Sequence, residues 1–404
     1  MKINLAVLFG GKSVEHEVSV ISAVQAMANL DRSKYEVIPV YITKGNEFYS
    51  GAALTRMEAY KDIPAMLKTC DRVGFRVRGD RTYLETEPEG RFAKRSSRLI
   101  DVAFPIVHGT NVEDGALQGF LETVNLAYVG PNVLGSAVGM DKYVMKVLLA
   151  EAKLPVLPGM RFSTSEWEDD AIVGQVEQAY PYPVIVKPVN LGSSVGISKA
   201  SDPTELRDAC DLAFTFSRHV LIEPAVVNLR EINCSVVGDA DQAEASECEE
   251  PVMHDAILSY ADKYVGGGGA KAAKGAKAGG GAGGKSGMAS LARAIPAPIS
   301  PDQREQIRAL AVDAFRCLDL AGVTRVDFLM DGLTGDVWIN EVNTIPGSLA
   351  FYLWEPVGVA YPQLLDRLIG LALKRRRQAA DVTYAFDSNI LAGASLGSKG
   401  AAKR

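Results

Sequence analysis

Residues 325–347 read RVDFLMDGLTGDVWINEVNTIPG. Two apolar runs, 325–330 and 337–342, flank a stretch that contains the turn-forming pairs Asp-Gly and Gly-Asp. This pattern predicts a β-hairpin, because Asp and Gly tolerate the backbone angles of a tight turn while the flanking runs suit half-buried strands. The chain therefore contains an antiparallel pair of strands towards its C-terminal end.

The polar side chains of this hairpin predict a metal site. Because side chains alternate across a strand, Arg325 and Asp327 share one face of the first strand. Glu341 and Asn343 share one face of the second. If the two faces coincide, hard oxygen ligands converge there, and such ligands suit Mg²⁺, which adds phosphate oxygens and water to one or two carboxylates. The alternative is a set of cross-strand ion pairs on a solvated face.

The segments before the hairpin alternate between strand and helix patterns. Ser300 is a favourable helix N-cap, Gln303 completes a capping box with it, and Pro301 suits the first helical position. We expect this helix to end at Gly322. Further strands are expected at 3–9, 35–42, 100–107, 184–189, near 197, 220–223 and 232–237, with helices at 17–30 and 141–152. Such alternation predicts an α/β fold with parallel or mixed sheets.

The overall composition indicates a folded protein with neither a nucleic-acid nor a membrane partner. Its 404 residues suffice for two to four domains at roughly 100–200 residues each. Forty-three basic against 49 acidic residues give a net charge of −6, which disfavours binding to phosphate backbones. No apolar run reaches the roughly 18 residues of a membrane span. Five widely spaced cysteines indicate free thiols in a reducing compartment, so we expect a cytoplasmic location.

Residues 266–287 depart from the rest of the chain. They consist of eleven Gly, six Ala, four Lys and one Ser. Such a segment has no apolar surface to bury and predicts a flexible loop. Gly279, Gly284, Lys285 and Ser286 formally match a phosphate-binding loop. That motif requires a strand before it and a helix after it, so we attribute the match to the biased composition.

Two small-residue loops suit charged ligand groups. Residues 192–196 (GSSVG) follow Lys187, and small residues let backbone N–H groups approach a phosphate, although an ordinary glycine turn is the alternative. Residues 10–13 follow the first strand and precede a helix, where anions commonly bind. Glu15 and Glu17, however, occupy the first turn of that helix. Their charge suits a ligand ammonium better than a phosphate.

One histidine stands at a position where ligands often bind. His108 follows the strand expected at 100–107, and the ends of strands in α/β sheets commonly face a ligand. The alternative is a capped polar residue with a structural role. The sequence alone leaves both interpretations open.

Taken together, these segments resemble the D-alanine–D-alanine ligases of the ATP-grasp superfamily over residues 3–375. The resemblance rests on short motifs that follow one another in the family's order. They are LFGGKSVEHEVS at 8–19, HG at 108–109 with EDG at 113–115, GMDK at 139–142, VKP at 186–188 with GSSVG at 192–196, REI at 230–232, DKY at 262–264, RVDF at 325–328 and NEVNTIPG at 340–347.

The resemblance implies an α/β fold in which an N-terminal parallel-sheet domain, called preATP-grasp, precedes an ATP-grasp fold with an α+β C-terminal part. The implied boundaries are 1–130 for the first domain, 131–215 for the central subdomain, 216–375 for the C-terminal subdomain and 376–404 for a tail. ATP would bind between the two subdomains with Mg²⁺, or alternatively Mn²⁺. In the implied reaction ATP phosphorylates the carboxylate of one D-alanine, and a second D-alanine attacks the acyl phosphate to give D-alanyl-D-alanine for peptidoglycan.

The resemblance also implies roles for individual residues. Glu15 would hold the first substrate's ammonium, with His108 nearby. The residues that would link Glu15 to a mobile loop over the site are Ser193 and Tyr264. Arg325 and the backbone N–H of Gly347 would stabilise the tetrahedral oxyanion. The implied ATP contacts are Lys142, Lys187, Glu223, Glu231 and Lys263, and the implied metal ligands are Asp327, Glu341 and Asn343.

Two departures from the family's pattern fall on the acceptor side. The stretch after Gly347 is shorter than usual, so Ser348 and Leu349 match the binders of the second substrate's carboxylate only if a gap is allowed. The tract 266–287 lies inside the family's mobile loop and lengthens it. The reaction class is therefore better supported than the identity of the acceptor.

Three other functions compete with this interpretation. A sister ligase would use D-serine, D-lactate or another amino acid as acceptor, although Tyr264 favours D-alanine because depsipeptide-forming relatives lack that tyrosine. A catalytically silent nucleotide-binding module would not require the full set of charged residues in the hairpin. A phosphate-loop hydrolase using Lys285 depends on the compositional match set aside above. Because family members are commonly dimers, a homodimer is expected.

Overall fold

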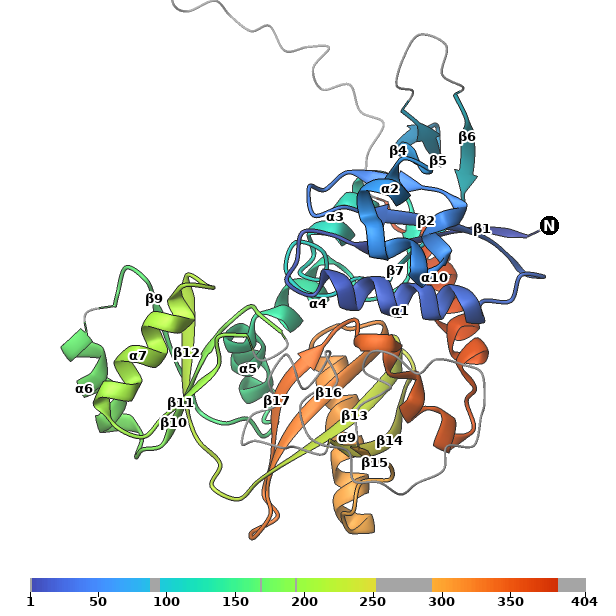
Figure 1. Ribbon diagram of the computed structural model, residues 1–404. Helices are drawn as coiled ribbons and strands as arrows, with labels where there is room; N and C mark the ends of the chain where they lie inside the picture. Colours follow the sequence, from blue (N-terminus) through green and yellow to red (C-terminus); the bar gives the residue numbers. More distant parts are fainter. Residues whose placement is uncertain (1, 88–94, 168, 193–194, 252–292, 384–404) are drawn as a thin grey trace, which may run out of the picture.

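The computed structural model describes residues 2–87, 95–167, 169–192, 195–251 and 293–383. Over these ranges the strands form three sheets, each packed with its own helices (Figure 1). The alternation of strands and helices confirms the predicted α/β class. None of the helices in the described part of the chain is long and apolar enough to cross a membrane.

The first sheet has eight strands in the order β6-β5-β4-β3-β2-β1-β7-β8. These are β1 (Ile3–Gly10), β2 (Tyr35–Ile42), β3 (Phe48–Ser50), β4 (Asp71–Arg78), β5 (Arg81–Thr86), β6 (Ser97–Ile100), β7 (Val102–Pro105) and β8 (Ala127–Tyr128). Four neighbouring strands of this sheet, β2, β1, β7 and β8, are parallel. The other pairings are antiparallel. Residues 5–9 of β1 are fully buried, as expected for a central parallel strand with helices on both faces.

The prediction of a single strand over residues 100–107 is wrong. The segment belongs to two strands with different hydrogen-bonded neighbours, because β6 pairs with β5 whereas β7 pairs with β1. The break falls at Asp101, whose carboxylate accepts a hydrogen bond of 2.7 Å from the backbone of Asn4. Asp101 therefore separates β6 from β7, and its carboxylate is hydrogen-bonded to β1.

The helices of this first region cover the sheet and connect its strands. They are α1 (His16–Asn29), α2 (Ile63–Leu67), α3 (Ala116–Thr123) and the short 3₁₀ helices η1 (Ala52–Thr55) and η2 (Met57–Asp62). The helix expected at 17–30 is confirmed as α1 to within one residue at each end. Its apolar positions Val20, Ala23 and Met27 are buried in the same core as β1.

The central sheet is antiparallel, in the order β11-β10-β12-β9. Its elements are β9 (Met160–Ser163), β10 (Val184–Pro188), β11 (Ser198–Ala200), β12 (His219–Pro224), α6 (Asp169–Ala179) and α7 (Pro203–Phe214). β12 lies beyond residue 215, so this sheet extends past the boundary expected there. The helices α4 (Val133–Met140) and α5 (Lys142–Glu151) lead into it, and the Asp141 carboxylate caps α5 by accepting two backbone N–H bonds.

The third sheet is antiparallel, in the order β15-β14-β13-β16-β17. Its strands are β13 (Leu229–Gly238), β14 (Ala243–Pro251), β15 (Arg293–Ala294), β16 (Gly322–Asp331) and β17 (Val337–Asn343). The expected hairpin is confirmed as β16 and β17. The helix α9 (Pro301–Cys317) has the predicted Ser300 capping box, but it ends before Gly322. Asp319 adopts a positive φ of 50° and Gly322 already begins β16, so the chain leaves the helix earlier than expected.

The last helix returns to the first sheet. α10 (Tyr361–Ala380) follows the 3₁₀ helices η4 (Gly347–Leu353) and η5 (Glu355–Val357). Leu364, Leu365 and Leu368 of α10 are fully buried in the core that contains β1. Figure 1 shows α10 next to α1 and the strands of the first sheet. The tail expected from residue 376 thus begins inside a helix, and residues 384–404 lie outside the described residues. This packing ties the last described helix to the N-terminal sheet.

Candidate active site

The polar faces of the β16–β17 hairpin coincide, as the sequence predicts. Arg325 stands opposite Asn343 and Asp327 opposite Glu341 in the register of the two strands. Arg325 donates from Nε and Nη2 to the two carboxylate oxygens of Asp327 over 2.6 Å each. Asn343 Nδ2 donates to Asp327 Oδ2 over 3.0 Å. The cluster is therefore a connected hydrogen-bonded group on one face of the hairpin.

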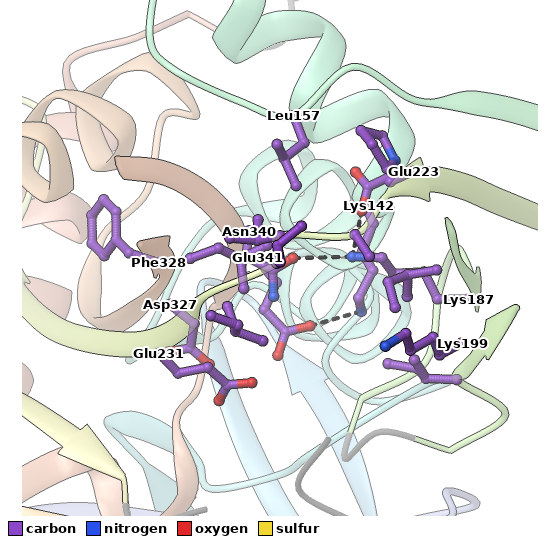
Figure 2. Close-up of a pocket in the computed structure, with 18 residues that line it drawn as sticks. Lys142, Leu157, Lys187, Lys199, Glu223, Glu231, Asp327, Phe328, Asn340 and Glu341 are labelled. Atoms are coloured by element: carbon purple, nitrogen blue, oxygen red, sulfur yellow. Dashed lines mark hydrogen bonds and ion pairs between the residues drawn. The ribbon is translucent and has the colours of Figure 1, made fainter. Parts of the chain in front are cut away.

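A cavity of about 280 Å³ lies between this hairpin and the central sheet (Figure 2). This is close to the lower end of the volumes of small-molecule sites, roughly 300–1,000 Å³. Lys142, Lys187 and Lys199 gather on one side of it. Its apolar walls include Leu157, Ile185, Ile197, Val226, Leu229, Phe328 and Leu329. An apolar slot that ends in a group of lysines suits a flat base joined to a chain of phosphates.

Two of the predicted ATP lysines hold carboxylates across the cavity. Lys142 Nζ lies 3.0 Å from Glu341 Oε2 and donates to the backbone oxygen of Leu191 over 2.6 Å. Lys187 Nζ lies 2.5 Å from Glu223 Oε2 and donates to Asn340 Oδ1 over 3.0 Å. Both ammonium groups are thus fixed in place by residues of β12, β17 and the loop after β10.

Lys146 is a buried cation of this site that the sequence reasoning missed. It lies one helical turn after Lys142 in α5, is 5% exposed and pairs with Glu223. Burial lowers the pKa of Lys146 to about 8, against the opposing charge of Glu223. Burial alone would raise the pKa of Glu223, but the charges of Lys146 and Lys187 hold it below its usual range. The four-residue spacing of Lys142 and Lys146 on one helix was the available signal.

A smaller cavity of about 40 Å³ adjoins the first and shares Lys142 and Glu341 with it. The other side chains that line it include Glu15, His108, Glu113, Arg325 and Asn343, together with Gly192 and Gly347. The two cavities therefore bring together, within the described residues, most of the site residues that the resemblance implies.

Glu15 is placed by two glycines that approach it closely. It precedes α1 and is 6% exposed. A Cβ atom at Gly192 would lie 2.8 Å from Glu15 Oε2, and one at Gly109 would lie 2.9 Å from it. Only glycine therefore fits at these positions without displacing the carboxylate. Glu17, by contrast, is exposed and pairs with Lys44 at 2.7 Å, so it takes no part in the cavity.

Glu113 is a second residue that sequence reasoning did not single out. Its carboxylate accepts hydrogen bonds from the backbone of Gly109 and Ile345 over 2.8 Å each and from Thr344 Oγ1 over 3.0 Å. Burial and the nearby charge of Glu15 raise its pKa to about 7. It ties the loop after β7 to the segment that leads to Gly347, and its place in the EDG motif was the only signal.

The turn after Gly347 has an unusual backbone. Ser348, Leu349 and Ala350 have φ values of 52°, 53° and 48°, the left-handed region that costs about 1–2 kcal/mol for each non-glycine residue. All three residues are buried. The Ser348 hydroxyl has no hydrogen-bond partner within the described residues, so this buried oxygen is available to a ligand group.

The remaining predicted site residues divide into two groups. Glu231 lines the large cavity and Leu349 lies in the strained turn. Ser193, Lys263 and Tyr264, together with the tract 266–287, lie outside the described residues.

The donor set of the hairpin fits a hard divalent cation. Asp327 and Glu341 supply carboxylate oxygens and Asn343 an amide oxygen, the ligand types that Mg²⁺ and similar ions prefer. No group of three or more His, Cys, Asp or Glu side chains that could hold a metal occurs in the described ranges. A set of two carboxylates and one amide suits an ion that completes its coordination with phosphate oxygens and water rather than with a full protein cage.

Comparison with known families agrees with this geometry. Residues 4–131 match a family model described as D-ala D-ala ligase N-terminus. Residues 148–278 and 286–370 match a second model described as D-ala D-ala ligase C-terminus. The chain belongs to the D-alanine–D-alanine ligase family. The resemblance inferred from the motifs is thereby confirmed over nearly the whole chain.

Individual relatives and solved structures support the same assignment. The chain is 38% identical to D-alanine–D-alanine ligase from Geobacillus thermodenitrificans over 96% of its own length and 100% of the relative's. It is 41% identical to the ligase of a Thermoanaerobacter species over 93% and 98% of the two chains. The structure of D-alanine-D-alanine ligase from Coxiella burnetii superposes with a TM-score of 0.75 at 28% identity, covering 94% of this chain and 96% of that one. The ATP-grasp fold expected from the motifs is thus confirmed, and the family uses ATP and a divalent metal.

Proposed function

We propose that this chain is an ATP-dependent ligase that joins two D-alanine molecules for peptidoglycan synthesis. The observation that carries the proposal is the junction of the two cavities at Lys142 and Glu341. A nucleotide in the large cavity would end with its phosphates at this junction. A small zwitterion in the second cavity would have its carboxylate at the same place. Transfer of a phosphoryl group between the two ligands requires this arrangement.

The reaction follows from elementary carboxylate chemistry. A carboxylate is a poor electrophile, so one carboxylate oxygen of the first D-alanine attacks the γ-phosphorus of ATP and ADP leaves. The amine of the second D-alanine then attacks the carbonyl carbon of the acyl phosphate, inorganic phosphate leaves, and the amine loses a proton. The first step depends mainly on positioning and on neutralising charge, which is the task suited to Lys142 and Lys187.

The remaining roles are assigned by chemistry and by position in the family motifs. Glu15, at the wall of the small cavity, is suited to the ammonium of the first substrate. Arg325 and the N–H of Gly347 line the same cavity and would donate to the oxyanion formed by amine attack. The unpartnered hydroxyl of Ser348, with Leu349, is suited to the carboxylate of the second substrate. His108 lies in the wall beside Glu15.

The rest of the nucleotide site is assigned in the same way. Glu223 and Glu231 both line the large cavity, and by their match to the family's residues they would contact the adenine and the ribose, respectively. Lys263, Ser193 and Tyr264 retain the roles that the motifs imply, at the phosphates and in the link from Glu15 to the loop over the site. Such a loop would exclude water, which otherwise hydrolyses the acyl phosphate.

Asp327, Glu341 and Asn343 would hold the divalent metal. We propose Mg²⁺ rather than Mn²⁺, because a few hard oxygen ligands leave several positions for water and phosphate. When bound, the metal supplies neutralisation of the phosphate charge that develops during transfer. The ion pair of Lys142 with Glu341 supports this assignment, because it joins the hairpin edge to a lysine assigned to the phosphates.

A ligase that uses D-serine as acceptor is the second candidate. The structure of VanG D-Ala:D-Ser ligase from Enterococcus faecalis superposes with a TM-score of 0.73 at 28% identity, covering 92% of this chain and 100% of that one. This agreement is nearly as good as with the D-alanine-D-alanine ligase, so the fold does not separate the two acceptors. Tyr264 in the DKY motif disfavours only the depsipeptide-forming relatives, so the acceptor experiment decides between D-alanine and D-serine.

The decisive experiment offers acceptors one at a time. The protein is mixed with ATP, Mg²⁺ and D-alanine, alone or with D-serine or D-lactate, and phosphate release and product mass are measured. We expect the mass of D-alanyl-D-alanine as the main product in every mixture. A dominant mixed product would identify a sister ligase, and ATP binding without phosphate release would identify a silent nucleotide-binding module. The homodimer and the cytoplasmic location stay predictions.

A further inference from the structure

A hydrogen-bonded clamp closes around residues 345–348. His108 Nδ1 lies 2.8 Å from the carbonyl oxygen of Ile345, and His108 Nε2 lies 3.2 Å from Ser22 Oγ. The backbone N–H of Ser348 donates to the same Ser22 oxygen over 2.9 Å. Every residue of the clamp is at most 4% exposed. Two side chains from the first α/β region therefore hold both ends of a four-residue segment that follows β17.

Chemistry fixes the direction of each hydrogen bond in the clamp. A carbonyl oxygen can only accept, so His108 carries a proton on Nδ1. Burial lowers the pKa of His108 to about 4, so the imidazole is neutral near pH 7 and its Nε2 must accept the hydroxyl proton of Ser22. The Ser22 oxygen in turn accepts from the N–H of Ser348. Both ring nitrogens of His108 and the Ser22 hydroxyl are thus hydrogen-bonded to other groups of the protein.

The segment 345–348 contains groups that are assigned to binding of the second, acceptor amino acid. Gly347 lies inside it, and it continues directly into the three left-handed residues 348–350. Such a turn persists only where its surroundings determine it. We propose that Ser22 is a positioning residue that fixes Ser348 and the turn behind it for binding of the second amino acid. The proposal rests on the proposed ligase function and assigns His108 to the same clamp.

Ser19 offers a matched control for Ser22. It lies three residues earlier in α1, is fully buried, and its hydroxyl likewise makes two hydrogen bonds, in this case both to backbone groups. It accepts from the N–H of Gly10 over 2.7 Å and donates to the carbonyl of Ile106 over 2.6 Å. These partners lie in and beside the first sheet rather than in the turn. Removing either hydroxyl costs stability, but only Ser22 acts on the segment 345–348.

The test compares Ser22→Ala, Ser22→Thr and Ser19→Ala in the full chain. Initial rates of D-alanyl-D-alanine formation over a wide range of D-alanine separate the Michaelis constants of the donor and acceptor sites. For Ser22→Ala we expect the acceptor KM to rise about tenfold or more, while the donor KM and the KM for ATP change by less than about threefold. Ser22→Thr keeps the hydroxyl and should restore the acceptor KM. Ser19→Ala should leave the acceptor KM unchanged.

A second measurement does not depend on activity. Nitrogen-15 NMR of the imidazoles, assigned with a His108→Asn variant, should show His108 protonated on Nδ1 and not on Nε2, and its Nε2 signal should move in Ser22→Ala. Three results would each overturn the clamp. In the kinetics these are an unchanged acceptor KM in folded Ser22→Ala, or a raised acceptor KM that a normally melting Ser22→Thr does not restore. In the NMR spectrum it is a proton on His108 Nε2. If the wild-type chain makes no dipeptide at all, the proposed function fails, and the NMR spectrum still decides the clamp.

Discussion

Replacing Arg325 by lysine should remove most of the turnover and leave nucleotide binding in place. In the structure Arg325 presents two N–H groups to the two oxygens of Asp327 over 2.6 Å each, and both residues are buried. Lysine keeps the positive charge but cannot reproduce this planar, two-pronged geometry. The cation of the variant would therefore no longer be held in the position from which it can donate to an oxyanion.

The size of the effect follows from the same contacts. Losing one of the two charge-assisted hydrogen bonds should lower the free energy of unfolding by about 1.5–3 kcal/mol. Losing an oxyanion donor should lower kcat on the order of 10²–10³-fold. Arg325 lines the small cavity and not the large one, so the KM for ATP should change by less than about threefold.

Arg230→Lys is the matched control. Arg230 makes the same two-pronged pair with Glu250, over 2.8 and 2.7 Å, in the same sheet, and it lines neither cavity. Steady-state kinetics with phosphate release and urea unfolding are measured for both variants. Arg230→Lys should lose some stability and keep its kcat. An unchanged kcat with a raised KM for ATP in Arg325→Lys would move Arg325 into a binding role and refute the reasoning.

Four further outcomes are expected. Glu341→Gln keeps the shape of the side chain but removes an anionic ligand, so turnover at saturating Mg²⁺ should fall roughly 10³-fold without loss of the fold, and activity within a few-fold of wild type would contradict the metal assignment. Lys146→Met leaves Glu223 with one cationic partner instead of two, so the free energy of unfolding measured in urea should fall by about 3 kcal/mol. Deleting residues 266–287 should keep kcat within about tenfold, because loop-closure entropy changes slowly with length; loss of all activity in a variant that binds ATP and melts normally would show that the tract is required. The pKa of Glu113 is raised by burial to about 7 from 4.5, so this group binds a proton more readily in the folded state and makes folding less favourable as pH rises from 4.5 to 7. Glu113→Gln should therefore lose less stability than wild type between pH 5 and 7 in urea titrations.

The parts of the fold that could be predicted are those with a local signal. The hairpin carries its turn residues and its alternation within about twenty residues, and α9 carries its capping box at its own start. The prediction of one strand over 100–107 is wrong because no local pattern reveals that β6 and β7 pair with different neighbours. The return of α10 to the first sheet is likewise a long-range packing event that periodicity cannot specify.

Some residues of the site can likewise be predicted from nearby sequence, whereas others can be recognised only in the folded structure. The convergence of Asp327 and Glu341 follows from strand alternation once the hairpin is recognised. Lys146 and Glu113 owe their roles to partners far along the chain, 77 residues away for Glu223 and 232 for Ile345. Without the fold, a lysine in a helix and a glutamate in a loop are indistinguishable from solvated surface residues.

Two lysines that line the large cavity, Lys142 and Lys187, must change partner before they can receive phosphates. Lys142 is paired with Glu341 and Lys187 with Glu223, and removing one member of a buried pair leaves an uncompensated charge. Lys142 can turn to a phosphate at low cost only if another cation takes its place beside Glu341. With the metal assignment proposed above, the nucleotide and a divalent ion at this hairpin should therefore favour each other's binding. Because such coupling is reciprocal, each ligand should raise the affinity for the other by the same factor.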